Sequence, residues 1–297
     1  MRARVRQRWL LALLLLLPLS FLVDRIRTVP PIHRAEWLEA GGLRWRAVRA
    51  GRGDTTLVLL HGYGEHLLTW RWVFDALARD HAVLAVDLPG FGGSDKPAGP
   101  YTVEAMVARL RALIDRWTTG PLILVGHSMG GALAAALALE APERIVALVL
   151  IAPAGLDRGL SRIGDLGEGG RTAIGWWESL RAFITPLHDP TWLAEPEPMA
   201  SYDPIADPAY RAAATRVLEE FEFDGMDSGY ARLDRPVLVI WGRNDPVIPY
   251  STAARLAELL PCGRVETLNT LHRPQVERPD TVARLLRAFL AAPRCAR

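Results

Sequence analysis

The stretch "LILVGHSMGGALAAALALEAP", from Leu122 to Pro142, decides the fold because a glycine-rich turn joins a β-rich apolar run to an alanine-rich helical run. Ser128 stands between the glycines of this turn. A serine hydroxyl becomes a good nucleophile when it is held outside regular structure, beside a base and near hydrogen-bond donors. The segment Gly126-His127-Ser128-Met129-Gly130 matches G-x-S-x-G, the strand-to-helix turn that presents such a nucleophile. The alternative is an ordinary glycine-rich turn with an idle serine.

The order of apolar runs along the chain indicates the architecture around this turn. Short β-rich runs alternate with segments of helical periodicity, which predicts an α/β protein whose mostly parallel sheet carries helices on both faces. A hairpin around Gly41-Gly42 adds two strands, so we expect eight strands in all. The other strands are expected at Thr56–Leu60, Ala82–Val86, Leu122–Val125, Ile145–Ile151, Val237–Trp241 and Val265–Leu268, and helices at Val103–Trp117, Ala132–Leu139, Thr252–Leu260 and Thr281–Leu290.

Residues 153–236 break this alternation. They lack a strong strand pattern and are rich in tryptophan, tyrosine and phenylalanine. A structureless loop of this length is implausible inside a compact domain. The sequence therefore predicts a helical cap at 153–236, inserted after the sixth strand between core segments 30–152 and 237–297.

Residues 1–29 form a separate N-terminal segment. Four arginines within the first eight residues precede the apolar stretch from Trp9 to Val23, a pattern typical of a signal peptide or a membrane anchor. The stretch is short for a spanning helix, but no A-x-A-like cleavage site follows it. We expect an uncleaved anchor in preference to a cleaved signal or a buried core helix. The excess of arginine before the stretch predicts a cytoplasmic N-terminus, with the rest of the chain anchored or exported on the far side of the membrane.

Composition limits the partners that we expect. The 297 residues carry a formal net charge of +2, half of them are hydrophobic and 23% are charged, which is ordinary for a globular protein. No basic stripe interleaved with aromatic residues occurs beyond the N-terminus, so nucleic acid is not expected as a partner. The seven histidines are scattered and there is no C-x-x-C, so neither a metal nor a cofactor is expected. The oligomeric state stays open.

The two cysteines, Cys262 and Cys295, fit more than one compartment. An exported protein would pair them, whereas a cytosolic protein would keep them as separate thiols. From the sequence we expect separate thiols in preference to a disulfide.

A second glycine-bounded loop, His61-Gly62-Tyr63-Gly64, follows a predicted strand in "LVLLHGYGEH". Catalysis at Ser128 needs backbone N–H groups for a developing oxyanion. The amides of Tyr63 and of Met129, the residue after Ser128, are the candidates for this oxyanion hole. His61 is expected to be structural, and an ordinary turn is the alternative for the whole loop.

Asp245 and His272 are the candidate partners of Ser128. Elbow-type hydrolases place the serine, the acid and the histidine in this order along the chain. Asp245 follows a predicted buried strand in "VLVIWGRNDPVIP", and His272 follows the last predicted strand in "VETLNTLHRPQVERP". Both loops therefore reach the carboxyl edge of the sheet, where ligands bind in open α/β folds. Taken singly, an Asp-Pro turn and a surface histidine are the alternatives.

The motifs "HGYG", "DLPGFGGSDKP", "GHSMGG", "WGRNDPVIP" and "HRPQVERP", in this order, resemble the α/β-hydrolase fold superfamily, in particular its capped esterases, lipases, haloperoxidase-like enzymes and C–C bond hydrolases. The resemblance covers nearly everything from about residue 36 onward. It implies Ser128 as nucleophile, His272 as general base and then acid, and Asp245 as the carboxylate that orients His272. Leu271 departs from the family, where glycine commonly precedes the histidine. Asp87, in the "DLPGFGGSDKP" loop, is assigned no chemistry.

The resemblance also narrows the reaction. Related dehalogenases and epoxide hydrolases carry aspartate at the elbow, where this chain has Ser128, so those reactions are disfavoured. C–C hydrolases often have asparagine before the serine, whereas His127 stands here as in many esterases and lipases. We therefore expect hydrolysis of a carboxylic ester, preferably an apolar small-molecule ester, through an acyl-enzyme. The alternatives are C–C bond hydrolysis, cofactor-free perhydrolysis and a non-catalytic binding protein on the same fold.

Overall fold

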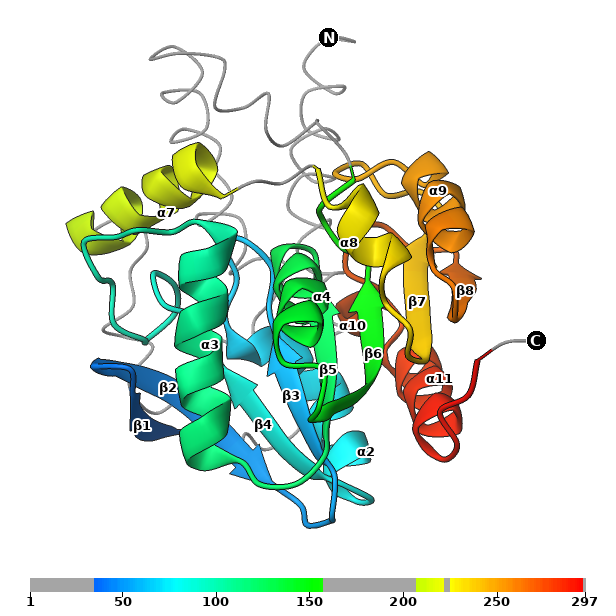
Figure 1. Cartoon of the computed structure of the whole chain (residues 1–297), viewed down its shortest axis with the longest axis horizontal. Coiled ribbons are helices and arrows are strands. Elements are labelled where there is room, and N and C mark those ends of the chain that lie inside the picture. The colour runs from blue at the N-terminus through cyan, green and yellow to red at the C-terminus, as the bar shows by residue number, and fades with distance from the viewer. Residues whose placement is uncertain (1–34, 157–206, 222–224, 296–297) are drawn as a thin grey trace, which may run out of the picture.

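The computed structural model describes residues 35–156, 207–221 and 225–295, and it contains one eight-stranded sheet (Figure 1). The strand order is β1-β2-β4-β3-β5-β6-β7-β8. The β1–β2 and β2–β4 pairings are antiparallel, and all the other pairings are parallel. The predicted fold class is confirmed. The strands are β1 (Glu36–Ala40), β2 (Leu43–Ala50), β3 (Thr56–Leu60), β4 (Ala82–Val86), β5 (Leu122–His127), β6 (Ile145–Ile151), β7 (Val237–Gly242) and β8 (Gly263–Leu268).

Helices cover both faces of this sheet (Figure 1). α3, α4 and α8 lie together on one face, and α2, α10 and α11 lie on the other. Thr102 caps α3 by accepting a hydrogen bond from the Ala105 amide. The bounds are η1 (Leu67–Trp70), α2 (Arg71–Ala78), α3 (Val103–Trp117), α4 (Met129–Glu140), α7 (Pro208–Glu220), α8 (Asp227–Ala231), α9 (Ser251–Leu259), α10 (Pro274–Glu277) and α11 (Pro279–Leu290).

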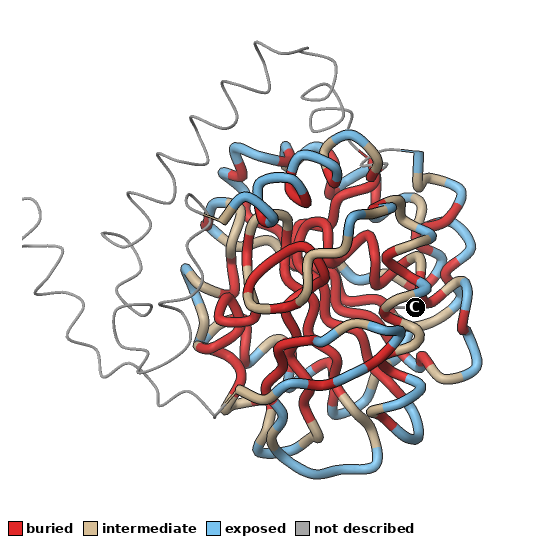
Figure 2. The backbone as a smooth tube through the Cα atoms, turned by 90° about the vertical axis from the view of Figure 1, so that its left-hand side faces the viewer, coloured by how far each residue is buried: buried red, intermediate tan, exposed pale blue. Residues whose placement is uncertain are grey.

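The central strands are buried because helices pack on both of their faces. Figure 2 shows the buried segments gathered in the interior of the molecule. Every residue of β5 and of β7 is buried. This explains why their sequences are continuous apolar runs rather than alternating patterns. The edge strand β8 is only partly buried, and its sequence is correspondingly more polar.

The helix α4 begins at Met129, earlier than the predicted start at Ala132. Gly130 and Gly131 have low helix propensity, which obscures the start of the helix in the sequence. They are needed for packing: a Cβ at Gly130 would lie 2.3 Å from the Leu60 carbonyl oxygen, and one at Gly131 would lie 2.7 Å from Pro153 Cβ. Glycine therefore lets the first turn of α4 approach the end of β3.

The described parts of the predicted cap contain two helices, α7 and α8, while residues 157–206 and 222–224 lie outside the described residues. The short α8 packs on α4 and α9. Its fully buried Tyr230 donates a hydrogen bond to the Ala154 carbonyl at 2.5 Å. Although its sequence falls in the interval 153–236, α8 thus packs against the core.

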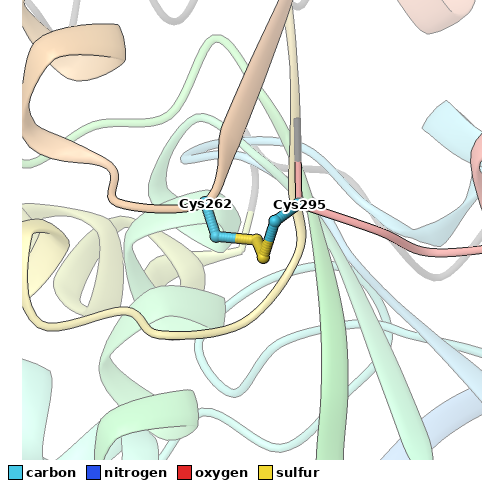
Figure 3. The surroundings of a disulfide bond; sticks show 2 residues. All are labelled: Cys262 and Cys295. Carbon is cyan, nitrogen blue, oxygen red and sulfur yellow. A yellow bond between two sulfur atoms is a disulfide. The ribbon is translucent and has the colours of Figure 1, made fainter. Parts of the chain in front are cut away.

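Cys262 and Cys295 form a disulfide (Figure 3). Their Cα atoms lie 4.6 Å apart, within the range that a disulfide requires. The expectation of separate thiols was wrong, because a spacing of 33 residues carries no information about distance in the fold. The bond ties the segment after α11 to the loop before β8.

The predicted N-terminal anchor falls within residues 1–34, which lie outside the described residues. Among the helices of the described ranges, none has the length and apolarity needed to cross a bilayer.

Candidate active site

Ser128 occupies a sharp turn between β5 and α4. Its φ of 51° and ψ of −118° lie in a region that residues with a Cβ rarely adopt. Backbone hydrogen bonds hold the turn: the Ser128 amide donates to Ile151 O at 3.0 Å, and Ser128 O accepts from the Ala154 amide at 3.0 Å. Both bonds join the turn to the end of β6, so the neighbouring strand fixes the position of this serine.

The serine turn also depends on Gly126, the last glycine before Ser128. A Cβ there would lie 2.3 Å from the carbonyl oxygen of Gly130. No side chain fits between the end of the strand and the start of the helix. The spacing of glycines around Ser128 in the sequence therefore has a direct steric cause.

Asp245 and His272 lie together in the structure. His272 Nδ1 lies 2.7 Å from Asp245 Oδ2, and the Asp245 side chain is fully buried. Asp245 Oδ1 accepts hydrogen bonds from the amides of Val247 at 2.8 Å and Ile248 at 2.9 Å. An ionised carboxylate can only accept, so His272 Nδ1 carries the proton and Nε2 is left with a lone pair.

The loop that carries His272 passes directly over the end of β7. A Cβ at Gly242 would lie 1.8 Å from the Leu271 carbonyl oxygen. The Glu277 carboxylate braces the same loop by accepting from the amides of Leu271 at 2.7 Å and Arg273 at 3.0 Å. Contacts from β7 and α10 thus place His272 beside Asp245.

Leu271, the departure from the family pattern, leaves this loop intact. Among the described residues other than glycine, positive φ occurs at Ser128 and Ala152, so Leu271 has an ordinary backbone conformation. Its side chain is 52% exposed and points away from the packed interior. A glycine is not required at this position.

Burial lowers the pKa of His272 below its ordinary value, and the hydrogen bond to Asp245 opposes this shift. The nearby His127 lowers the pKa further, and the charges of Asp245 and Glu65 raise it. The net lowering keeps the imidazole neutral at pH 7. His272 is therefore in the form that accepts a proton.

The loop of His61 to Gly64 lies beside the serine turn. A Cβ at Gly62 would lie 3.1 Å from Ser128 Cβ and 2.9 Å from His127 Nδ1. Tyr63 follows Gly62 in this loop, and Met129 is the first residue of α4. The Met129 amide belongs to the first turn of a helix, where N–H groups lack intrahelical acceptors.

His61 and Asp87 have structural positions. His61 Nε2 accepts from the Leu88 amide at 2.9 Å, so its Nδ1 donates to Gly62 O at 2.7 Å. Asp87 accepts from the amides of Leu67 at 2.6 Å and Gly93 at 2.7 Å. Both side chains are fully buried, and their polar atoms are occupied by holding loops in place.

Aromatic side chains gather beside the Gly62 loop. Phe91 packs edge-on against Tyr63 at 5.5 Å and against Tyr210 of α7 at 6.0 Å between ring centroids. The Tyr63 hydroxyl donates to Ala214 O of the same helix at 3.2 Å. Figure 1 shows α7 above α3, at the edge of the sheet where the parallel strands end. An apolar wall thus borders the loop that carries Tyr63.

Two residues that the sequence did not single out for a role also converge here, Glu65 and His127. His127 Nδ1 lies 2.9 Å from Glu65 Oε2, and His127 Nε2 lies 2.9 Å from the His272 carbonyl oxygen. Both side chains are almost fully buried. The signal that was available is the position of Glu65, one residue after the HGYG loop.

A sheet of this order, with a glycine-bounded serine turn after its central strand, defines the class of α/β hydrolases. A sequence model of the alpha/beta hydrolase family matches residues 57–285. The chain belongs to this family and is a hydrolase.

Several relatives and solved structures are similar to the chain. It is 30% identical over 273 residues to a 2-hydroxy-6-oxo-2,4-heptadienoate hydrolase of Pseudomonas putida, covering 85% of this chain and 95% of that protein. It is 32% identical over 260 residues to the dihydrolipoyllysine-residue acetyltransferase component of an acetoin cleaving system of Pseudomonas putida, covering 85% and 68%. The crystal structure of a membrane phospholipase A, described as a bacterial virulence factor, matches with a TM-score of 0.70 and 26% identity, covering 98% of this chain and all of that one.

Proposed function

We propose that the chain hydrolyses a carboxylic ester through an acyl-enzyme on Ser128. His272 Nε2 takes the proton as Ser128 Oγ attacks the ester carbonyl carbon, and His272 then gives this proton to the departing alcohol. Asp245 holds the His272 ring in the required tautomer. In the second half, His272 removes a proton from water, the hydroxide attacks the acyl carbon, and Ser128 Oγ leaves with that proton.

The amides of Tyr63 and Met129 are proposed as the donors that stabilise the oxyanion in both halves. The Gly62 loop lies against the serine turn, and the Met129 amide opens a helix, whose N-terminus favours negative charge.

One observation carries the proposal: a serine in a strained turn and a buried Asp245–His272 pair come from loops at the same edge of the sheet. The chain segment between Ser128 and Asp245 includes the described helix α7, which brings apolar side chains to that edge. This supports an apolar acyl or alcohol group in the substrate.

We further propose a lipid ester as the substrate and a membrane-anchored or exported location. The match to a membrane phospholipase A over 98% of this chain supports both parts, as does the apolar N-terminal stretch. The disulfide between Cys262 and Cys295 favours an oxidising compartment. Fractionation of cells tests the location: we expect the wild-type protein in the membrane fraction and a variant lacking residues 1–29 outside it.

Hydrolysis of a carbon–carbon bond is the second candidate, because the chain is 30% identical to a 2-hydroxy-6-oxo-2,4-heptadienoate hydrolase. The same three side chains would serve that reaction. His127 before the serine favours the ester, since asparagine often stands there in the C–C hydrolases that the sequence resembles. Turnover of p-nitrophenyl esters and phospholipids, compared with that of a vinylogous diketone, distinguishes the two reactions.

Fluorophosphonate labelling with peptide mapping tests the mechanism. We expect one labelled residue, Ser128, and no labelling of Ser128→Ala. Asp245→Asn and His272→Ala should each lower ester turnover by about 10³-fold or more with the fold retained. Near-normal turnover by purified Ser128→Ala would show that another group is the nucleophile.

A further inference from the structure

Glu65 and His127 lie at the meeting point of three loops: the Gly62 loop, the serine turn and the loop of His272. His127 is adjacent to Ser128 in the chain, and its ring lies 4.8 Å from that of His272, measured between ring centroids. Its Nε2 lies 2.9 Å from His272 O. Glu65 Oε2 lies 2.9 Å from His127 Nδ1 and accepts from the Gly62 amide at 3.2 Å. The network joins the three loops through five polar atoms.

The hydrogen-bond geometry fixes the number of protons in this network. A carbonyl oxygen only accepts, so His127 Nε2 carries a hydrogen and donates it to His272 O. Two bare lone pairs 2.9 Å apart would repel, so one proton lies between His127 Nδ1 and Glu65 Oε2. Wherever this proton sits, the Glu65–His127 pair is neutral as a whole. A neutral pair tolerates burial far better than a lone charge does.

The surroundings leave little freedom to this pair. The exposed fractions of the two side chains are 6% for Glu65 and 1% for His127. Glu65 Oε1 is 3.9 Å from an Arg273 guanidinium nitrogen, which brings the residue after His272 into the same network. A shift of either buried side chain would therefore move the loops that carry Gly62 and His272.

We propose that Glu65 and His127 are positioning residues that hold the backbone of His272 in register with the Ser128 turn and the Gly62 loop. This rests on the proposed function, in which Ser128 and His272 exchange a proton. The pair reaches the reacting atoms only through others: His127 holds the main chain of His272, and Glu65 holds both His127 and the amide of Gly62. The backbone bond to His272 is distinct from the Asp245 contact, which orients the imidazole.

Two substitutions of His127 separate its two contacts. Glutamine can place an amide nitrogen near the former Nε2 and keep the donor to His272 O. Asparagine is shorter, so it retains only a polar atom near the former Nδ1. The readout is the fluorophosphonate labelling of Ser128, resolved into a binding constant and a first-order inactivation rate.

We expect His127→Asn to lower the inactivation rate by about 20-fold or more, because a misplacement of about 1 Å can lower a rate by about 100-fold. His127→Gln should stay within about fivefold of wild type, and the binding constant of both should change by less than about twofold. A loss of packing alone would not produce this split. Equal inactivation rates for the two variants, whether normal or lowered, would overturn the proposal.

Glu65 gives an independent measurement should a His127 variant not fold. Both contacts use Glu65 Oε2, so Glu65→Gln keeps one of them, either an acceptor for the Gly62 amide or a donor for His127 Nδ1, whereas Glu65→Leu has similar size and keeps neither. We expect the inactivation rate to fall about 20-fold or more in Glu65→Leu and by a clearly smaller factor in Glu65→Gln. Thermal unfolding of each variant accompanies these rates, and Glu258→Gln at an exposed position of α9 is the control.

The two proposals fail in different ways. Absence of labelling at Ser128 in wild-type protein would contradict the proposed function. Labelling of wild type at Ser128, together with unchanged inactivation rates in His127→Asn and Glu65→Leu, would overturn only the positioning role.

Discussion

The backbone conformation of Ser128, the proposed nucleophile, lowers the stability of the fold. Its φ of 51° belongs to the sharp turn between β5 and α4, but a Cβ makes this conformation unfavourable by about 1–3 kcal/mol. Glycine adopts positive φ without this strain.

We therefore predict that Ser128→Gly is more stable than Ser128→Ala by about 1 kcal/mol, after allowing for the greater flexibility of glycine in the unfolded chain. Both variants lack the hydroxyl and should lack esterase activity. Urea unfolding followed by tryptophan fluorescence measures the difference. A Ser128→Ala protein at least as stable as Ser128→Gly would mean that the turn is not strained.

The lowered pKa of His66 predicts that the fold loses stability at acid pH. Loss of water around its partly buried ring lowers its pKa from 6.5 to about 4, against the opposing charge of Asp87. Between these values the unfolded chain binds the proton and the folded one does not, so stability falls as the pH falls from 6.5 towards 4. The shifts of His61, His81 and His272 have the same sign.

We expect His66 alone to lower the free energy of unfolding by about 1–2 kcal/mol between pH 7.5 and pH 5. In His66→Gln this part of the decrease should disappear, which urea unfolding at the two pH values would measure. An identical decrease in the variant would show that the pKa of His66 is not lowered.

At this scale the sequence predicted what a local motif encodes. Ser128 was predicted as the nucleophile because glycines flank it at fixed spacing, and Asp245 and His272 were predicted as its partners because each follows a recognisable strand; these roles stay predictions. The structure brings the latter two within 2.7 Å. Glu65 was missed because its partner is 62 positions away and no short pattern links them.

Among the elements, the contact of β7 with the His272 loop has the clearest consequence. Gly242, the last residue of β7, leaves room for the Leu271 carbonyl, which would meet a Cβ at 1.8 Å. Gly42 offers a matched control, since a Cβ there would meet nothing within 4 Å despite its φ of +74°.

We predict that Gly242→Ala lowers ester turnover by about 100-fold by displacing the His272 loop. Gly42→Ala should cost stability of about 1 kcal/mol through backbone strain and leave turnover unchanged. Comparing turnover with the unfolding midpoint for each variant tests this. Full activity in Gly242→Ala would show that the loop adjusts without disturbing His272.

The elements that the sequence predicted best are those whose burial is uniform. Strands β3, β4 and β6 and helix α3 have the predicted bounds, because their apolar residues form continuous runs or one helical face. The short α10 and the start of α4 were less visible, since tertiary contacts rather than propensity determine them. The helix α8 lies in the interval that the sequence analysis assigned to the cap. Its packing on α4 is a tertiary contact and has no counterpart in the local sequence pattern.

For the whole molecule, the disulfide between Cys262 and Cys295 is the main covalent constraint on the fold. It closes a loop of 33 residues that includes β8, His272 and α11. Closing a loop of this size reduces the entropy of the unfolded chain.

We predict that Cys262→Ser/Cys295→Ser lowers the free energy of unfolding by about 3 kcal/mol. The reductant dithiothreitol should have a similar effect on the wild type and none on the double variant. Urea unfolding with and without reductant measures both effects. A wild type indifferent to reductant would mean that the two sulfurs are not joined in solution.

The strand order affects the rate at which this protein folds. Thr56 pairs with Leu122 and Leu148 with Val237, partners that are 122 − 56 = 66 and 237 − 148 = 89 positions apart. Sheets that depend on such distant partners form slowly. A newly synthesised chain therefore passes through an interval in which it is still unfolded and without hydrolase activity, and an unfolded chain of this kind is the form that the proposed export requires.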